Sequence, residues 1–246
     1  MAKCKLCGEE KVLRDSHILP EFIFKPLYDS IHRFHVISTI PHDKNRIFQK
    51  GIREELLCKD CEQIFSKYER YASIVFNKSE NINVHRINNE YHFSGIRYDL
   101  FKLFQLSILW RIGISKCPGF EKIDIGPHEQ KIRTMLINEN PGKYFEYGTI
   151  IIALIGENKL LNGLIITPEQ FKHDGFTFIR VVFAGYIWLF IVSSHSSRFP
   201  FKEYFLSEKD ELIIQVRNAE NMKFIRKFAR NLYDLGKLEE YNLLIA

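Results

Sequence analysis

Two pairs of cysteines, each with two residues between its members, place the strongest constraint on how this chain can fold. The pairs are Cys4 with Cys7 and Cys58 with Cys61. Zinc prefers four tetrahedral ligands, and a two-residue spacer lets both thiolates of a pair face one ion. Gly8 follows the first pair, where glycine adopts a positive φ with little strain. The spacing therefore predicts one structural zinc ion bound by all four cysteines.

Chance spacing and a redox pair are the two alternative readings of the pattern. Redox CxxC pairs follow a strand in a β-α-β unit, and neither pair stands in such a pattern. The N-terminus lacks the order of a signal peptide, so we expect a cytoplasmic chain, in which paired cysteines bind metal rather than form disulfides. Cys117 stands alone before Pro118 and is expected to act as a small buried hydrophobic residue.

The composition indicates an ordinary globular protein without a membrane span. Of the 246 residues, 46% are hydrophobic and 26% are charged. The most apolar stretches, 103–114 and 180–194, are too short or too interrupted by arginine to cross a bilayer. The formal net charge of +5 is compatible with a polyanionic partner without being diagnostic of one.

The chain divides on composition into a zinc-binding domain over residues 1–77 and a second domain over residues 92–246. The polar run 77–91 between them reads as a linker or an exposed hairpin. Periodicity predicts helices over 20–28, 61–74, 98–114, 127–138 and 222–235, and strands over 33–38, 147–155, 163–167, 176–183 and 186–194. The predicted fold class is therefore α+β, with a largely antiparallel sheet in the second domain.

The segment between the cysteine pairs carries a recognisable signature. The string DSHILP occupies residues 15–20, and Glu55-Leu56-Leu57 leads into the second pair. This order resembles the zinc-stapled branch of the HNH endonucleases, in which a treble-clef, ββα-metal unit lies between two CxxC pairs. The resemblance covers residues 1–75 and implies a treble-clef-like fold for the zinc-binding domain.

The resemblance also implies an activity. His17 matches the general base that activates water in that family, and Ile18 and Pro20 match its hydrophobic and proline positions. A neutral imidazole can accept a proton at cytoplasmic pH. In the family a catalytic divalent metal, Mg²⁺ or Mn²⁺ by its ligand preference, would bind the scissile phosphate. A structural histidine inside the zinc unit is the alternative reading of His17.

Three positions depart from the family pattern. Ser16 stands where a metal-binding aspartate belongs, with Asp15 displaced by one residue, and Arg53 stands where an asparagine is usual. Glu62 follows Cys61 where a metal-binding histidine is expected. Its carboxylate could act at the catalytic site as a ligand of Mg²⁺ or Mn²⁺. A solvated side chain that interacts with the helix dipole is the other reading of Glu62.

Further histidines and whole-chain strings add weaker signals. His32, His35 and His42 could supply a ligand, although scattered surface histidines are the favoured reading. The strings SHILPEF, GIREELLCKDCEQIFSKYE and LSILWRIGISK look like a group of bacterial HNH-annotated proteins, some linked to anti-phage defence.

The second domain shows no catalytic motif, but it contains two unusual basic features. Arg111 lies inside an apolar helix and is expected to need a buried partner. Segment 217–237 has six basic and two acidic residues, and four of the basic ones share a helix face: Lys223, Arg226, Lys227 and Arg230. Together with Arg53 they could bind a phosphate backbone, or they could form an ordinary solvated face.

Three functions remain open on the sequence. The first is an HNH-like, metal-dependent endonuclease that acts on nucleic acid. The second is a catalytically degenerate zinc module that docks nucleic acid or a protein partner, including a second copy of the chain. In the third, the second domain carries the function and the zinc unit braces it.

Overall fold

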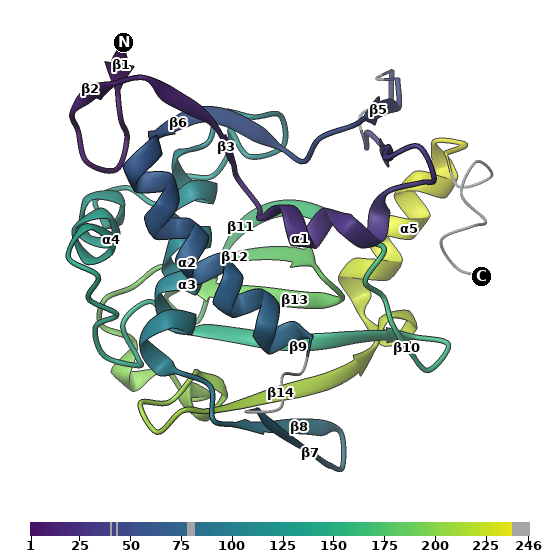
Figure 1. The fold of residues 1–246 in the computed structure, drawn as a ribbon. Helices are drawn as coiled ribbons and strands as arrows, with labels where there is room; N and C mark the ends of the chain where they lie inside the picture. The colour runs from purple at the N-terminus through teal and green to yellow at the C-terminus, as the bar shows by residue number, and fades with distance from the viewer. Residues whose placement is uncertain (40, 43, 78–81, 238–246) are drawn as a thin grey trace.

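The computed structural model describes residues 1–39, 41–42, 44–77 and 82–237, and it shows an α+β fold (Figure 1). This confirms the predicted fold class. The helices are α1 (Glu21–Phe24), α2 (Lys59–Phe76), α3 (Tyr98–Ile114), α4 (His128–Ile137) and α5 (Lys223–Asp234). The strands are β1 (Ala2–Lys3), β2 (Glu10–Lys11), β3 (Leu13–His17), β4 (Phe34–Val36), β5 (Arg46–Phe48), β6 (Arg53–Cys58), β7 (Asn83–Ile87), β8 (Glu90–Ser94), β9 (Thr149–Gly156), β10 (Lys159–Leu160), β11 (Ile166–His173), β12 (Phe176–Phe183), β13 (Tyr186–Ile191) and β14 (Glu211–Asn218).

The N-terminal part is a pair of small hairpins followed by a long helix. The β1–β2 hairpin carries the first cysteine pair, β3 pairs antiparallel with β6, and β6 runs directly into α2. This is the order of elements expected of a treble-clef-like unit. The residues between β3 and β6, 18–52, form an insert that contains α1 and the β4–β5 hairpin.

Eight strands of the described residues form one large sheet. Its order is β11-β12-β13-β9-β14-β8-β7, with β10 paired to β9. Every neighbouring pair is antiparallel except β14 with β9, which is parallel. The prediction of a mostly antiparallel sheet is therefore confirmed. The predicted strand over 163–167 lies mostly before the observed β11, which begins at Ile166.

The β12–β13 hairpin shows how local sequence sets the sheet. Its two turn residues, Ala184 and Gly185, have φ of 53° and 81°. Positive φ at both positions is the geometry of a two-residue turn whose twist matches that of the flanking strands. The strands on either side are almost entirely apolar and lie in the middle of the sheet, covered on both faces.

Helix α3 lies between α2 and the sheet, which explains why it is buried on every side (Figure 1). Phe65 of α2 meets Trp110 with ring centroids 6.0 Å apart, and Phe104 meets Trp188 of β13 at 6.1 Å. Hydrophobic burial at this scale is the main source of folding free energy. One continuous core thus runs from Cys4 to Val216.

This continuity bears on the predicted division of the chain. Residue 92, the expected start of the second domain, falls inside β8, and the β7–β8 hairpin belongs to the large sheet. The exposed-hairpin reading of the polar run therefore describes it better than a linker, while residues 78–81 lie outside the described part of the chain.

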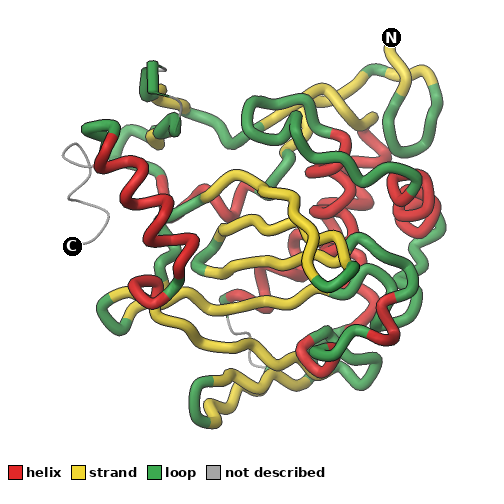
Figure 2. Tube along the Cα trace, turned by 180° about the vertical axis from the view of Figure 1, so that it is seen from behind, coloured by secondary structure: helices red, strands yellow, loops and turns green. Residues whose placement is uncertain are grey.

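The other face of the sheet is covered in part by α5, which crosses one end of it (Figure 2). Phe224 and Ile225 of α5 pack against Leu154, Val182 and Ile187 of the sheet. Arg180 on β12 stacks its guanidinium over Phe224 at 3.9 Å from the ring centroid. None of the described helices is both long and apolar enough to cross a membrane.

Candidate metal site and histidine site

The four predicted zinc ligands come together. The Sγ atoms of Cys4, Cys7, Cys58 and Cys61 all lie within 4.8 Å of one another, and the Cys7 and Cys58 sulfurs are 4.0 Å apart. Tetrahedral zinc with bonds of about 2.3 Å would separate its sulfur ligands by roughly 3.8 Å. The cysteine cluster therefore fits a metal ion such as zinc.

Backbone geometry assembles the cysteine cluster. Gly8 has a φ of 82° and donates its N–H to the Cys4 carbonyl at 2.9 Å, which closes the loop around the first pair. Lys5 donates to the Leu56 carbonyl at 2.9 Å, so this loop is attached to β6. The Cys58 N–H, at the start of α2, points to the Cys4 sulfur at 3.3 Å. Amide hydrogen bonds of this kind stabilise thiolates.

The thiols respond to this environment in opposite ways. Burial raises the pKa of Cys4, but hydrogen bonds from the Cys58 and Cys7 backbone outweigh it and lower the pKa to about 7. Burial is also the largest influence on Cys61, and its pKa is raised far above the usual range. A bound cation would favour the thiolate form of all four, because metal binding releases thiol protons.

His17 lies at the end of β3, outside the cysteine cluster. Its Nε2 is 2.7 Å from Oε2 of Glu21, the first residue of α1. The other carboxylate oxygen of Glu21 accepts a hydrogen bond of 2.7 Å from the Tyr28 hydroxyl. Across the hairpin, Arg53 is the register partner of His17. His17, Glu21, Tyr28 and Arg53 form what we call the histidine site.

The charges of the histidine site set the tautomer of His17. Burial raises the pKa of Glu21, but hydrogen bonds from Tyr28 and His17, together with the Arg53 charge, hold it below its usual value. Burial and the bond to Glu21 raise the pKa of Tyr28 to about 12. Glu21 is therefore an ionised acceptor, so the proton of neutral His17 lies on Nε2 and the lone pair on Nδ1.

Arg53 supplies the positive charge of the histidine site. Its terminal nitrogens lie 3.7 Å from Oδ2 of Asp15 and 3.7 Å from Oε2 of Glu21, beyond hydrogen-bond distance. Its side chain is 26% exposed, and its buried Nε makes no hydrogen bond within the described residues. The guanidinium thus keeps donors for an additional anion beside His17.

Ser16 lies on the opposite side of β3 from His17. Successive residues of a strand face opposite ways, and Ser16 is buried while Asp15 has a side chain that is 56% exposed. The Ser16 hydroxyl accepts the Leu57 N–H at 3.1 Å and fastens β3 to β6. The serine at the family's metal-binding position is therefore a structural residue here, and Asp15 shares the His17 side.

Glu62 lies in the first turn of α2, immediately after Cys61. Its Oε1 is buried without a hydrogen-bond partner among the described residues. Among the described residues, the cysteine cluster is the one group of three or more histidine, cysteine or acidic side chains close enough to hold an ion. The structure thus does not assemble Glu62 and His17 into a second ligand set.

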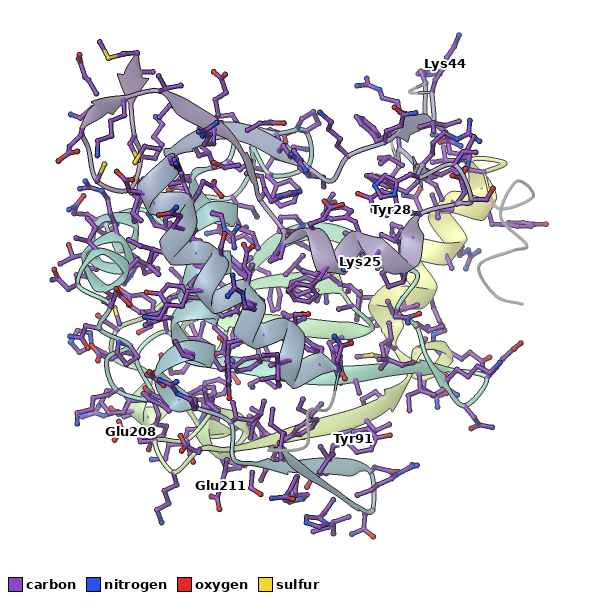
Figure 3. All side chains as sticks on the ribbon, viewed as in Figure 1. Lys25, Tyr28, Lys44, Tyr91, Glu208 and Glu211 are labelled. Carbon is purple, nitrogen blue, oxygen red and sulfur yellow. The ribbon has the colours of Figure 1, made fainter. Side chains whose placement is uncertain are left out.

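The remaining predicted residues lie elsewhere. Lys223, Arg226, Lys227 and Arg230 are all exposed on α5, across the molecule from the cysteine cluster, and none forms an ion pair within the described residues (Figure 1). The end of this helix adjoins the insert, because Lys237 donates to the Ser38 carbonyl at 2.6 Å. Figure 3 places Lys25 and Lys44 on the same insert. His32 stacks on Tyr28 with ring centroids 3.8 Å apart.

Glu21, Tyr28 and the partners of Arg111 were not predicted from the sequence. A glutamate four residues after His17, at the start of the helix expected after Pro20, was a usable signal for Glu21. Arg111 was expected to need a buried partner, and its partners outside its own helix are Glu69 and the His17 carbonyl, both at 2.7 Å. Nothing local marks the second contact, since 94 residues separate Arg111 from His17.

Comparisons with protein-family models, with curated proteins and with solved structures found no match for this chain.

Proposed function

We propose that this chain is an HNH-like endonuclease of nucleic acid, with His17 as its general base. The observation that carries the proposal is the hydrogen bond from His17 Nε2 to Glu21, made at the end of a hairpin that the cysteine cluster fastens. A histidine whose second nitrogen is held by a carboxylate is a recurring arrangement for proton abstraction.

The site residues have distinct parts in such a reaction. Glu21 holds the Nε2–H tautomer, so Nδ1 can take a proton from a nucleophilic water. The attacking oxygen then bonds to phosphorus while the leaving oxygen departs with the electron pair of the broken bond. Arg53, opposite His17 on β6, would bind the scissile phosphate through its charge.

The family resemblance also implies a catalytic Mg²⁺ or Mn²⁺. The described residues beside His17 do not fit a preassembled site for it, because they include no group of three ligands and the serine at the family's aspartate position is buried. The carboxylates on the His17 side are Asp15 and Glu21, and Glu21 is already bonded to His17 and Tyr28. Glu62 lies in the first turn of α2, after Cys61. The cleavage assay with Mg²⁺, Mn²⁺ or EDTA tests whether the activity requires such an ion.

The metal of the cysteine cluster has a different role in the proposal. We assign it as one structural Zn²⁺, since four thiolates in a closed site leave no position open for substrate. It would hold β1–β2 against β6 and the start of α2, and so support the strand that carries His17.

Nucleic acid is the proposed partner. The exposed basic face of α5, defined by Lys223, Arg226, Lys227 and Arg230, and the Arg53 charge would contact its phosphates. We place this activity in the cytoplasm, where reduced cysteines persist, and in bacterial anti-phage defence, which rests on the resemblance alone.

One observation favours a second candidate, a catalytically degenerate zinc module that docks nucleic acid or a protein. The Ser16 hydroxyl is committed to the Leu57 N–H inside the protein, so the family's metal-binding position has become structural. In this case nucleic acid would bind without being cleaved.

The deciding experiment incubates the full chain with plasmid DNA, single-stranded DNA and RNA, each with Mg²⁺, with Mn²⁺ and with EDTA. Wild type is compared with His17→Ala, Glu21→Gln and the control His173→Ala, whose exposed side chain lies at the end of β11. Cleavage that His17→Ala abolishes and His173→Ala retains supports the endonuclease. Binding without cleavage supports the docking module, and equal cleavage by His17→Ala rejects His17 as the base.

A further inference from the structure

Arg111 on α3 is a buried charge that the proposed chemistry does not use. The residue is 2% exposed and lies in a helix whose buried residues are mostly apolar. Removing a guanidinium from water is strongly unfavourable unless its donors are paired. A chain that keeps such a residue in its core must satisfy it with specific partners.

All three guanidinium nitrogens have partners, and they come from three separate segments. Nη1 donates to the His17 carbonyl of β3 and to Oε1 of Glu69 on α2, each at 2.7 Å. Nε and Nη2 donate to the carbonyl and the hydroxyl of Ser107, one turn earlier on α3, at 3.2 and 3.3 Å. The guanidinium also lies over the Phe65 ring, 5.1 Å from its centroid.

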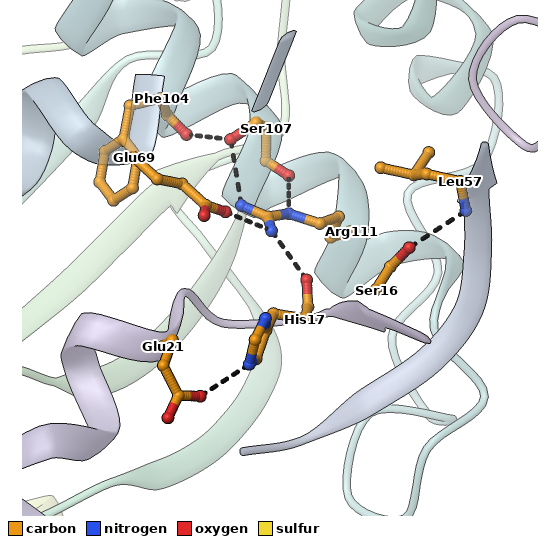
Figure 4. A network of polar contacts seen from close by, with 8 residues as sticks. All are labelled: Ser16, His17, Glu21, Leu57, Glu69, Phe104, Ser107 and Arg111. Atoms are coloured by element: carbon orange, nitrogen blue, oxygen red, sulfur yellow. Dashed lines mark hydrogen bonds and ion pairs between the residues drawn. The ribbon is translucent and has the colours of Figure 1, made fainter. Parts of the chain in front are cut away.

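These contacts hold His17 from two sides. Figure 4 shows Arg111 at the backbone carbonyl of His17 and Glu21 at its imidazole. A charge-assisted hydrogen bond is stronger than a neutral one, so it restrains the carbonyl at the point where β3 ends. The carbonyl and the Cα–Cβ bond of His17 are joined through the Cα–C bond, and the β3–β6 pairing restrains the backbone there, so holding the carbonyl also restrains the direction of the side chain. The position of the imidazole therefore depends on Arg111 as well as on Glu21.

We infer that Arg111, together with its counter-charge Glu69, is a positioning residue that sets the His17 imidazole for proton abstraction. This inference rests on the proposed role of His17 as base. It gives Arg111, alone on α3, an effect on the position of the base, although Arg111 does not belong to the histidine site. The competing explanation is a purely structural ion pair that stabilises the core without affecting where His17 points.

Two variants of the same network separate these explanations. Arg111→Met keeps much of the volume and removes every donor, including the one to His17. Ser107→Ala removes the hydroxyl contact of Arg111 and leaves the His17 and Glu69 contacts in place. If Arg111→Met does not fold, Arg111→Lys replaces it, because its ammonium ends one bond short of the Nη1 position and lacks the planar fork of the guanidinium.

The first measurement is the cleavage rate of the full chain. We expect Arg111→Met or Arg111→Lys to lower kcat by about 10- to 100-fold, with KM and bound metal unchanged, since small misplacements of a catalytic group have effects of this size. Ser107→Ala should keep kcat within about twofold of wild type. Equal kcat in the Arg111 variant and wild type, or an equal loss in Ser107→Ala, overturns the inference.

The second measurement does not depend on activity. The ring proton resonances of His17, assigned by their absence from His17→Ala, are recorded by NMR for each variant. We expect them to shift or broaden in the Arg111 variant and to stay at the wild-type position in Ser107→Ala. Unchanged resonances in the Arg111 variant reject the positioning role. If wild type cleaves no substrate, the endonuclease proposal fails, and this spectrum still decides whether Arg111 positions His17.

Discussion

The Nε2 atom of His17 lies 2.7 Å from Oε2 of Glu21, across the junction between β3 and α1. Pro20 occupies the N-cap of α1 in an extended conformation, with φ −56° and ψ 147°. The chain therefore turns sharply enough that residues four apart meet without lying on one helix. This short contact sets the tautomer of His17, the proposed base. It also contributes to the folding stability of the insert.

The contact predicts a pH dependence of stability. The folded pKa of Glu21 lies below its usual value, so ionised Glu21 stabilises the fold above that value and the contribution is lost as the pH falls through the lower, folded pKa. At pH 7 we expect Glu21→Gln to reduce the unfolding free energy by about 1 kcal/mol, allowing for solvent screening of this partly exposed group.

Urea denaturation of wild type and Glu21→Gln between pH 7 and pH 3 checks this. The difference between the two proteins should shrink as the pH falls below about 5. Glu203→Gln, an exposed change on another part of the chain, serves as control. A difference that grows between pH 5 and pH 3 would contradict the assigned sign.

The cysteine cluster predicts one metal ion per chain. Cys58→Ser should lose the metal and lower the melting temperature, because a structural zinc site contributes folding free energy directly. Elemental analysis with a thermal melt measures both quantities. Cys117→Ser should retain the metal, since Cys117 lies outside the cluster and bonds instead to the Arg53 carbonyl. Full metal content in Cys58→Ser would remove it from the ligand set.

Gly51 predicts a packing effect on the histidine site. A Cβ at this position would lie 2.7 Å from two ring atoms of Phe24 and 3.3 Å from the His17 ring. Gly51→Ala should therefore destabilise the protein by about 1–3 kcal/mol and displace the imidazole. Gly163→Ala is the matched control, because a Cβ there meets nothing within 4 Å. Equal denaturation midpoints for the two variants would show that the Phe24 ring moves aside without lowering the unfolding free energy.

The basic face of α5 predicts a salt-dependent contribution to nucleic-acid binding. Neutralising Lys223 and Arg226 with glutamine should weaken binding, and each lost phosphate contact should reduce the slope of log K against log salt by about 0.9 for duplex DNA or 0.7 for single strands. Fluorescence anisotropy at several salt concentrations measures this. Lys209→Gln, an exposed change away from α5, should leave the slope as in wild type. An unaltered slope in the double variant would mark α5 as a solvated face.

Local sequence patterns were enough to predict the elements that neighbouring residues determine. The doubled CxxC spacing marked the cysteine cluster, and α3 and β12 begin and end at the predicted residues. Strand β14 was missed although Leu212, Ile214 and Val216 alternate toward the core. Its parallel pairing with β9 could not have been read from the sequence, since it depends on residues about sixty positions away.

The histidine site could likewise be predicted only where its residues are close in sequence. The string DSHILP pointed to His17, yet its partners depend on how the insert folds back and on which helix packs beneath β3. Glu21 was within reach of a pattern argument because it is close in sequence. The Arg111 contact was not, since a hydrogen bond to a backbone carbonyl leaves no mark on the identity of the residue that accepts it.

Trp110 and Phe65 meet edge to face at the centre of the contact between α2 and α3. The segment that contains the cysteine cluster could not be moved into another protein without α3, because the apolar side of α2 would then be exposed to water. Substitutions in the insert and at the hairpin tips should therefore be tolerated better than substitutions at the contact between the two helices.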